Sequence, residues 1–128
     1  QGRRHVQEYM MTDWDHATPR SVDWIMGSAM LLRSSAIREV GGLDEQFFMY
    51  YEDIDWCRRL WHAGYEVHYI PHSTMVHYHQ RLSAQTGLRT LLSWATRTHI
   101  RSALHYFYKY NGRSLPVSHH TPAMAQTL

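Results

Sequence analysis

Residues 47–64 of the chain have the sequence FFMYYEDIDWCRRLWHAG, and this stretch decides how the neighbouring elements can be arranged. It predicts a helix from Glu52 to Ala63, in which apolar residues recur at helical spacing. Gly64 follows directly and is well suited to end this helix, because glycine accepts the left-handed backbone found at such positions. The first predicted element is therefore a short helix with acids in its first turn and five large side chains before it.

A helical wheel at about 100° per residue divides this helix into two arcs. One broad arc is apolar: Ile54, Trp56, Cys57, Leu60, Trp61 and Ala63. The other arc is polar: Glu52, Asp55, Arg58, Arg59 and His62. Asp53 breaks the pattern because it falls within the apolar arc, where a carboxylate is costly unless it is hydrogen-bonded or has a function.

Asp53 has two interpretations on this pattern alone. It can cap backbone amides in the first helical turn, or it can act as a general base that is ionised and partly buried. The positive end of the helix dipole favours ionised carboxylates at both Glu52 and Asp53. Asp55 and Arg59 have the (i, i+4) spacing of a structural ion pair. The large side chains at 47–51 form either part of the core or an apolar wall that shields the base and offers a ring to a sugar.

Shorter elements are predicted on both sides of this helix. Apolar runs predict strands, or pieces of strands, at 22–26, 29–33, 66–70 and 74–78. Helices are predicted at 34–40 and from about residue 87 to residue 110, the latter with a bend near 96–98 where its two apolar stripes are offset. The fold class is therefore α/β, with too few strands to close a standard doubly wound sheet.

Composition limits the classes of protein to which the chain can belong. Its 128 residues suffice for one domain, and a net charge of +2 is too small to indicate nucleic-acid binding. Its single cysteine, Cys57, excludes an intrachain disulfide and favours a reducing compartment. No apolar run approaches the roughly 20 residues that span a bilayer, and no signal peptide is visible. Because residue 1 is not Met, we expect the chain to be a piece of a longer protein.

Several motifs, in their order and spacing, resemble the second half of glycosyltransferase family 2, and the rhamnosyltransferase-like members in particular. These motifs are GSAMLLR at 27–33, VGGLDEQFFMYYEDIDWCRRL at 40–60, AGY at 63–65 and IP at 70–71. The likeness runs from about residue 23 to residue 83 and extends weakly into 101–102 and 106–109. It implies a partial GT-A (Rossmann-like) fold, the acceptor-side half, with a few strands and a long C-terminal helix.

The same resemblance suggests four segments. They are an irregular lead-in at 1–21, the acceptor and catalytic-base half of a GT-A domain at 22–83, an amphipathic helical region at 84–113, and a flexible tail at 114–128. The nucleotide-binding half of the family, which ends in an Asp-x-Asp motif, is expected to lie in the longer parent protein.

The resemblance also implies roles for individual residues. Glu52 and Asp53 correspond to the acidic pair of the family, and Asp53 is the base that deprotonates the acceptor hydroxyl. Gly27 and Ser28 lie where members of the family line the acceptor pocket, and Gly27 would let the backbone approach the sugar. Tyr50 belongs to the apolar run and would offer its ring to the acceptor.

Trp24 and His77 each keep two interpretations. Trp24 either lines the acceptor pocket or packs in the core. His77 resembles the family histidine that follows a strand and joins the metal or the diphosphate, and it could share a cation with His79 on one face of a strand. Surface histidines are the other interpretation of this region, and Gln80 departs from the glycine of many relatives, which puts the role of His77 in doubt. A divalent cation, Mg or Mn, is expected in the full-length parent, with none bound to this fragment.

The predicted activity follows from the resemblance. The parent would be an inverting glycosyltransferase of cell-surface polysaccharide synthesis, which moves a sugar from a nucleotide-diphosphate sugar to a saccharide or lipid-linked acceptor. Rhamnose as the sugar follows from the likeness alone and from no pocket residue. The isolated fragment is expected to be inactive and to self-associate. The alternative is a non-catalytic carbohydrate-binding or interaction module on the same scaffold.

A basic row marks the predicted C-terminal helix, since Arg97, Arg101, His105 and Lys109 are each four residues apart. The row is either a solvated face or a surface that docks on an anionic membrane, where lipid-linked acceptors reside. In the second case Arg97, Arg101 and Lys109 make the contact. The protein would then be cytoplasmic and peripheral at the inner face of the bacterial cell membrane.

Overall fold

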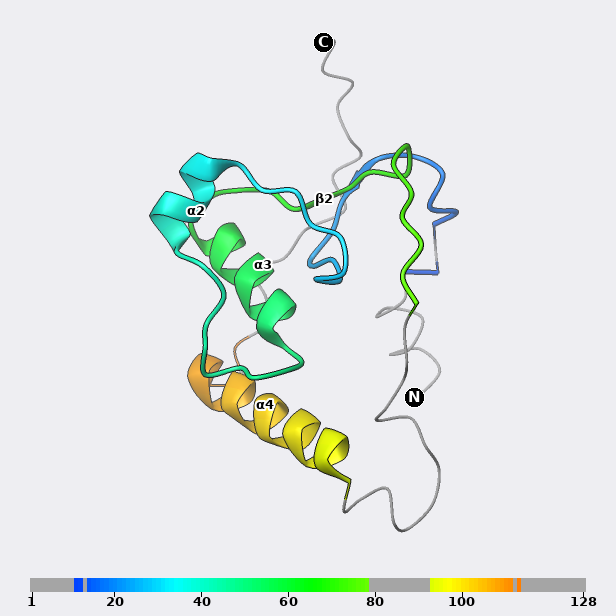
Figure 1. Ribbon diagram of the computed structural model, residues 1–128. Helices are drawn as coiled ribbons and strands as arrows, with labels where there is room; N and C mark the ends of the chain where they lie inside the picture. Colours follow the sequence, from blue (N-terminus) through cyan, green and yellow to red (C-terminus); the bar gives the residue numbers. More distant parts are fainter. Residues whose placement is uncertain (1–10, 13, 79–92, 112, 114–128) are drawn as a thin grey trace.

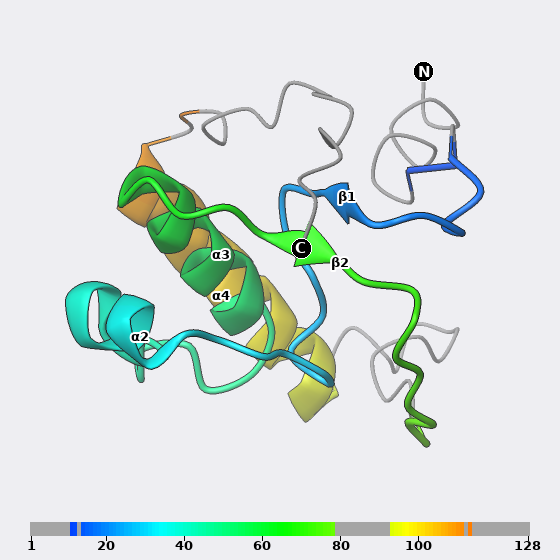
Figure 2. The ribbon, with the colours of Figure 1, turned by 90° about the horizontal axis from the view of Figure 1, so that it is seen from above.

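The computed structural model describes residues 11–12, 14–78, 93–111 and 113. In chain order its elements are β1 (Arg20–Ser21), α2 (Ser34–Val40), α3 (Glu52–His62), β2 (His68–Tyr69) and α4 (Trp94–Tyr110) (Figure 1). The two strands pair antiparallel, with Arg20 opposite Tyr69 and Ser21 opposite His68. Helix α3 packs against α2, and α4 runs alongside α3 in both views (Figures 1 and 2). The chain thus combines helices with a small sheet, which is compatible with the predicted α/β class.

The predicted bounds of α3 are confirmed to within one residue, because local sequence signals specify both ends of the helix. Three acids stand in its first turn, where the helix dipole favours negative charge. At the other end, Gly64 has a φ of +82°. The Gly64 amide donates to Trp61 O at 3.1 Å and the Tyr65 amide donates to Leu60 O at 3.0 Å, which is the hydrogen-bond pattern of a Schellman motif.

The predicted bend near residues 96–98 is wrong, because α4 continues as one helix through those residues. It begins after Ser93, whose hydroxyl accepts a hydrogen bond from the Thr96 amide at 3.2 Å, as an N-cap does. It ends at Asn111, a left-handed residue with a φ of +48°. The predicted start near residue 87 lies outside the described residues.

The strand predictions were largely wrong. No strand forms at 22–26, 29–33 or 74–78 within the described part of the chain, and β1 lies earlier, at Arg20–Ser21. Only the run at 66–70 contains a strand, the two residues of β2. The apolar runs are instead loop segments that are buried only in part. Val22 lies in the core and its amide donates to Val67 O at 2.8 Å, and Met30 and Leu32 pack against the core, whereas Leu31 and Val76 are exposed. Apolar content at these positions therefore predicted neither a strand nor consistent burial.

The core lies between α3, α2 and the sheet. Its buried members are Val22, Ala36, Cys57, Leu60 and Val67. Cys57 is fully buried, which raises the pKa of its thiol above the ordinary value. Among the described helices none is long and apolar enough to cross a bilayer.

The polar arc of α3 faces α4 rather than solvent. Asp55 is 0% exposed and Arg58 is 2% exposed, although both belong to the arc that the wheel separates from the apolar residues. The Arg58 guanidinium lies 3.8 Å from the centre of the Tyr110 ring, and Arg58 Nη1 donates to the Tyr106 hydroxyl at 3.2 Å. Both faces of α3 are therefore covered, one by apolar side chains and the other by the aromatic and charged side chains of α4.

Candidate functional site

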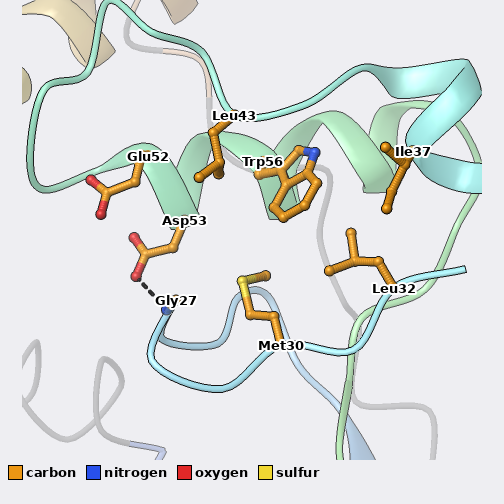
Figure 3. A pocket seen from close by; sticks show the side chains of 8 residues that line it. All are labelled: Gly27, Met30, Leu32, Ile37, Leu43, Glu52, Asp53 and Trp56. Carbon is orange, nitrogen blue, oxygen red and sulfur yellow. Dashed lines mark hydrogen bonds between the residues drawn. The ribbon is translucent and has the colours of Figure 1, made fainter. Parts of the chain in front are cut away.

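A cavity of about 430 Å³ opens beside the start of α3 (Figure 3). Its lining residues are Gly27, Met30, Leu32, Ile37, Leu43, Glu52, Asp53 and Trp56. Figure 3 shows the two acids at one end of the cavity and Leu32 and Ile37 at the other. The cavity therefore presents a pair of carboxyl groups at one end of an otherwise largely apolar wall.

Asp53 points across this cavity toward the loop before α2. Its Oδ2 accepts a hydrogen bond from the Gly27 amide at 2.9 Å, and its Oδ1 accepts one from the Ile54 amide at 2.8 Å (Figure 3). Each carboxylate oxygen has two lone pairs, so one on each oxygen remains available to a further donor. The two interpretations of Asp53 are therefore compatible, because the carboxylate can bind backbone amides and still accept a proton.

Gly27 keeps the space beside this carboxylate open. A Cβ atom at position 27 would lie 3.5 Å from Asp53 Cβ and 3.7 Å from Asp53 Oδ2. These are ordinary van der Waals distances, so a larger residue would fit without forcing the backbone apart. It would, however, occupy volume that an incoming hydroxyl needs to reach Oδ2.

Glu52 occupies a more enclosed position at the same end of the cavity. Burial raises the pKa of the Glu52 carboxyl, and the neighbouring Asp53 charge raises it further. Its Oε2 is enclosed and has no hydrogen-bond partner among the described residues. Burial at the cavity thus acts against the ionised form of this carboxyl, which the helix dipole favours.

The approach of the chain to α3 is strained. Tyr50 and Tyr51 both have a left-handed backbone, with φ values of +68° and +69°, which is uncommon for aromatic residues. Their rings are held by α4: Tyr50 lies 4.7 Å from the ring of His99, and Tyr51 lies 5.4 Å from the ring of Tyr106. The tight turn directs the chain so that Glu52 and Asp53 start the helix at the edge of the cavity.

The structure brings three of the predicted site residues together, namely Gly27, Glu52 and Asp53. The other predicted residues do not line this cavity. Trp24 packs against the core, Ser28 is exposed beside Gly27, and Tyr50 packs on α4. His77 lies in the exposed segment after β2, and its possible partner His79 lies outside the described residues.

The residues described do not fit a metal centre. No cluster of three or more His, Cys, Asp or Glu side chains that could hold an ion occurs among them. The carboxylates of Asp53 and Asp55, which share the letters of an Asp-x-Asp motif, have different partners: Asp53 Oδ2 binds the Gly27 amide, whereas Asp55 Oδ2 binds Arg59 Nε at 2.8 Å.

Trp56, Met30 and Leu43 are lining residues that the sequence analysis did not select. Trp56 could have been found, because it follows Asp53 by three residues and shares its side of the helix. Met30 and Leu43 lie in loops whose course depends on the tertiary fold. Their spacing along the chain therefore could not predict that they line the cavity.

Comparison with known proteins identifies the family of the chain. The sequence profile of glycosyl transferase family group 2 matches residues 4–120, nearly the whole chain. The chain belongs to this family. The predicted resemblance is thereby confirmed.

Several curated members of the family are similar to the chain. Rhamnosyltransferase WbbL of Escherichia coli K12 is 44% identical over 85 residues, which cover 66% of this chain and 30% of that protein. The N-acetylglucosaminyl-diphospho-decaprenol L-rhamnosyltransferase of Mycobacterium tuberculosis is 46% identical over 59 residues, or 46% of this chain and 19% of that protein. The pre-mycofactocin glycosyltransferase of the same species is 42% identical over 60 residues, which are 47% of this chain and 13% of that protein.

The chain therefore spans less than a third of the length of these relatives. No solved structure matches the chain significantly.

Proposed function

We propose that this chain supplies the acceptor side and the catalytic base of an inverting glycosyltransferase with a GT-A fold. The observation that carries the proposal is the Asp53 carboxylate at the edge of the cavity, held by the Gly27 amide with a lone pair free on each oxygen. Its position within a family of glycosyl transferases makes sugar transfer the reaction that such a base serves.

The proposed step is a single displacement. An acceptor hydroxyl enters beside Gly27 and gives its proton to Asp53 as its oxygen attacks the anomeric carbon of the donor. The bond between that carbon and the diphosphate oxygen breaks on the opposite face, the nucleotide diphosphate leaves with the bonding electrons, and the anomeric configuration inverts. Glu52 borders the same cavity, and burial raises the pKa of its carboxyl above the ordinary value.

The relatives suggest the substrates. Two of them are named as rhamnosyltransferases, and one name specifies an N-acetylglucosaminyl-diphospho-decaprenol acceptor. We therefore propose nucleotide-diphosphate L-rhamnose as donor, a saccharide linked through diphosphate to a lipid as acceptor, and a role in the synthesis of a cell-surface polysaccharide. The nucleotide-binding half, and the residues that hold a divalent cation on the diphosphate, belong in this proposal to the rest of the parent protein. The isolated chain is accordingly inactive.

Replacing Asp53 with Asn in the full-length parent tests this proposal. The variant keeps the shape of the side chain and one of its two oxygens but cannot take a proton, so transfer should fall by about 10²- to 10⁴-fold. Glu66→Gln is the matched control, because Glu66 is an exposed carboxylate that pairs with His68 at 2.8 Å, and it should transfer normally. Retained transfer by folded Asp53→Asn would refute the role of Asp53 and favour the alternative of a non-catalytic carbohydrate-binding module.

We further propose that α4 lies against the inner face of the bacterial cell membrane. Its solvent-facing side combines the exposed apolar residues Ile100, Leu104 and Phe107 with Arg97 and Arg101, and the helix contains no acidic residue. Lys109 was predicted to join this surface, but its ammonium binds Asp44 and Asp55 instead, at 2.6 and 2.7 Å.

Flotation with vesicles rich in anionic lipid tests this contact. The double change Arg97→Glu and Arg101→Glu in the full-length parent should reduce the bound fraction, and added salt should reduce binding of the unchanged protein. The control is Arg33→Glu with Arg38→Glu, which reverses two exposed charges on the α2 side. Equal binding by both double variants would refute the contact.

A further inference from the structure

The turn that joins α2 to α3 is held by side chains of α3 along its backbone. Arg59 Nη1 donates to Val40 O at 2.8 Å, and Arg59 Nη2 donates to Gly42 O at 2.7 Å. Between them, Trp56 Nε1 donates to Gly41 O at 2.9 Å. Three successive carbonyl groups are thus bound by two side chains that stand three residues apart on one helix.

The far end of the same turn is held by α4. Lys109 Nζ lies 2.6 Å from Asp44 Oδ2 and 2.7 Å from Asp55 Oδ1. The hydrogen bond from Lys109 lowers the pKa of the Asp44 carboxyl. Burial by itself would lower the pKa of Lys109, but its bonds to the two carboxylates outweigh this effect and the pKa is raised. The turn is therefore tied at its end by a charged contact that persists across the neutral pH range.

Asp55 joins the two sets of contacts. It is completely buried, and its Oδ2 accepts from Arg59 Nε at 2.8 Å while its Oδ1 accepts from the Tyr110 hydroxyl at 2.7 Å. Together with Asp44, it balances the charges of Arg59 and Lys109, so the cluster is neutral as a whole. A buried carboxylate with this many partners fixes the directions of both cations, and with them the path of the turn.

This turn forms part of the cavity that contains Asp53. Leu43 lies between the bound carbonyl of Gly42 and the bound carboxylate of Asp44, and its side chain lines the cavity. Trp56 contributes its ring to the same wall while its Nε1 holds the turn. Figure 3 shows Leu43 and Trp56 together on one side of the cavity, with Met30 facing them. Any movement of the turn therefore changes the distance between the Leu43 side chain and the Asp53 carboxylate.

We propose that Arg59 and Trp56 are positioning residues for the acceptor. They hold the turn at residues 40–44 so that Leu43 and the Trp56 ring confine the acceptor sugar with its hydroxyl facing Asp53. A wall that is already fixed before the acceptor binds lowers the entropic cost of binding, so a loosened wall weakens acceptor binding. The proposal rests on the function proposed above, in which the cavity receives the acceptor.

Two conservative changes in the full-length parent remove the hydrogen bonds and keep the bulk. Trp56→Phe retains a ring in the cavity but lacks the Nε1 donor. Arg59→Lys retains a charge for Asp55 but lacks the planar fork that reaches two carbonyl groups at once. Initial rates are measured with nucleotide-diphosphate L-rhamnose and a short-chain polyprenyl-diphospho-N-acetylglucosamine as probe acceptor. For each variant the KM of the acceptor should rise about three- to tenfold, with kcat and the KM of the donor changed less than about twofold.

Trp61→Phe is the matched control for Trp56→Phe. The Trp61 indole also donates to backbone carbonyls, Val22 O at 3.3 Å and Asp23 O at 3.2 Å, but its ring does not line the cavity. It should lower stability comparably while leaving the acceptor KM unchanged. Amide hydrogen exchange gives a second readout, and exchange at residues 41–45 should accelerate in the Trp56 and Arg59 variants but not in Trp61→Phe.

The outcomes separate this inference from the function on which it rests. An equal rise of acceptor KM in Trp61→Phe, or unchanged KM and unchanged exchange in the Trp56 and Arg59 variants, would overturn the positioning role. Full transfer by Asp53→Asn would overturn the base and leave the KM comparison intact as a test of the turn. A rise in acceptor KM confined to Trp56→Phe and Arg59→Lys, together with faster amide exchange at residues 41–45, would establish the positioning role.

Discussion

The buried carboxylate of Asp55 should be the most sensitive single position for stability in the described part of the chain. The change Asp55→Asn preserves the shape of the side chain but removes its charge. Wild-type Asp55 accepts from Arg59 Nε at 2.8 Å, from Lys109 Nζ at 2.7 Å and from the Tyr110 hydroxyl at 2.7 Å. In the variant a single carbonyl oxygen remains, and the new NH₂ group must face a cationic donor on one side.

The size of the destabilisation depends on the interactions that Arg59 and Lys109 keep in the variant. Removing one member of a buried ion pair typically costs about 3–5 kcal/mol. Arg59 still binds two backbone carbonyl groups, and Lys109 still binds Asp44, so neither cation is left alone. The side chains of Arg59 and Lys109 are also 21% and 28% exposed, which lets water replace part of the lost interaction. We therefore expect a loss near the lower limit, about 3 kcal/mol in the free energy of unfolding.

Urea denaturation of the full-length parent, followed by far-ultraviolet circular dichroism, measures this loss, because urea does not screen charges as guanidinium salts do. Glu66→Gln is the control, since the Glu66 side chain is 61% exposed and pairs with a histidine at the surface. Its effect should stay within about 0.5 kcal/mol. A loss below about 1 kcal/mol for Asp55→Asn would show that the buried cluster does not hold α3, α4 and the turn together.

Three further predictions concern the cavity and its surroundings. Gly27→Ala should leave the free energy of unfolding within about 1 kcal/mol, because its Cβ meets Asp53 at 3.5 Å, but should lower kcat measurably in the transfer assay. Burial raises the pKa of Glu52 in the folded state above its ordinary value of 4.5, so the folded state loses stability as the pH rises from 4.5 through the raised pKa. The change Glu52→Gln removes this loss, and it should therefore stabilise the protein at pH 7 but not at pH 4. Thermal melts at the two pH values measure the difference. Lys109→Met should cost about 2 kcal/mol in urea denaturation, since two carboxylates lose a cation, whereas Arg101→Met should cost under about 0.5 kcal/mol.

The helices and their ends were predictable because their causes are local. Gly64 ends α3 and Asn111 ends α4, and both adopt the left-handed backbone that ends helices. The strands were not predictable in the same way. The apolar runs at 22–26 and 29–33 form no strand, since a strand depends on a neighbour whose position the local sequence does not encode.

The candidate site was predictable in part. Asp53 stood out because a carboxylate in an apolar arc is costly, and the structure places it on the cavity beside Gly27. Leu43 was not predictable, because it reaches the cavity through a turn whose path is set by side chains of α3 and α4. The raised pKa of Glu52 was missed because desolvation depends on the walls around the carboxyl, and a helical wheel contains only the helix.

The sequence by itself determined which residues share a face of α3, through their periodicity, and its motifs carried the resemblance to the family. The tertiary structure alone decided what each face meets. The polar face of α3 became interior because α4 brings Lys109 and Tyr110 to Asp55, and a charge can be buried only where opposite charges and donors surround it. Such compensation comes from residues about 55 positions away in the chain, so no local pattern could contain it.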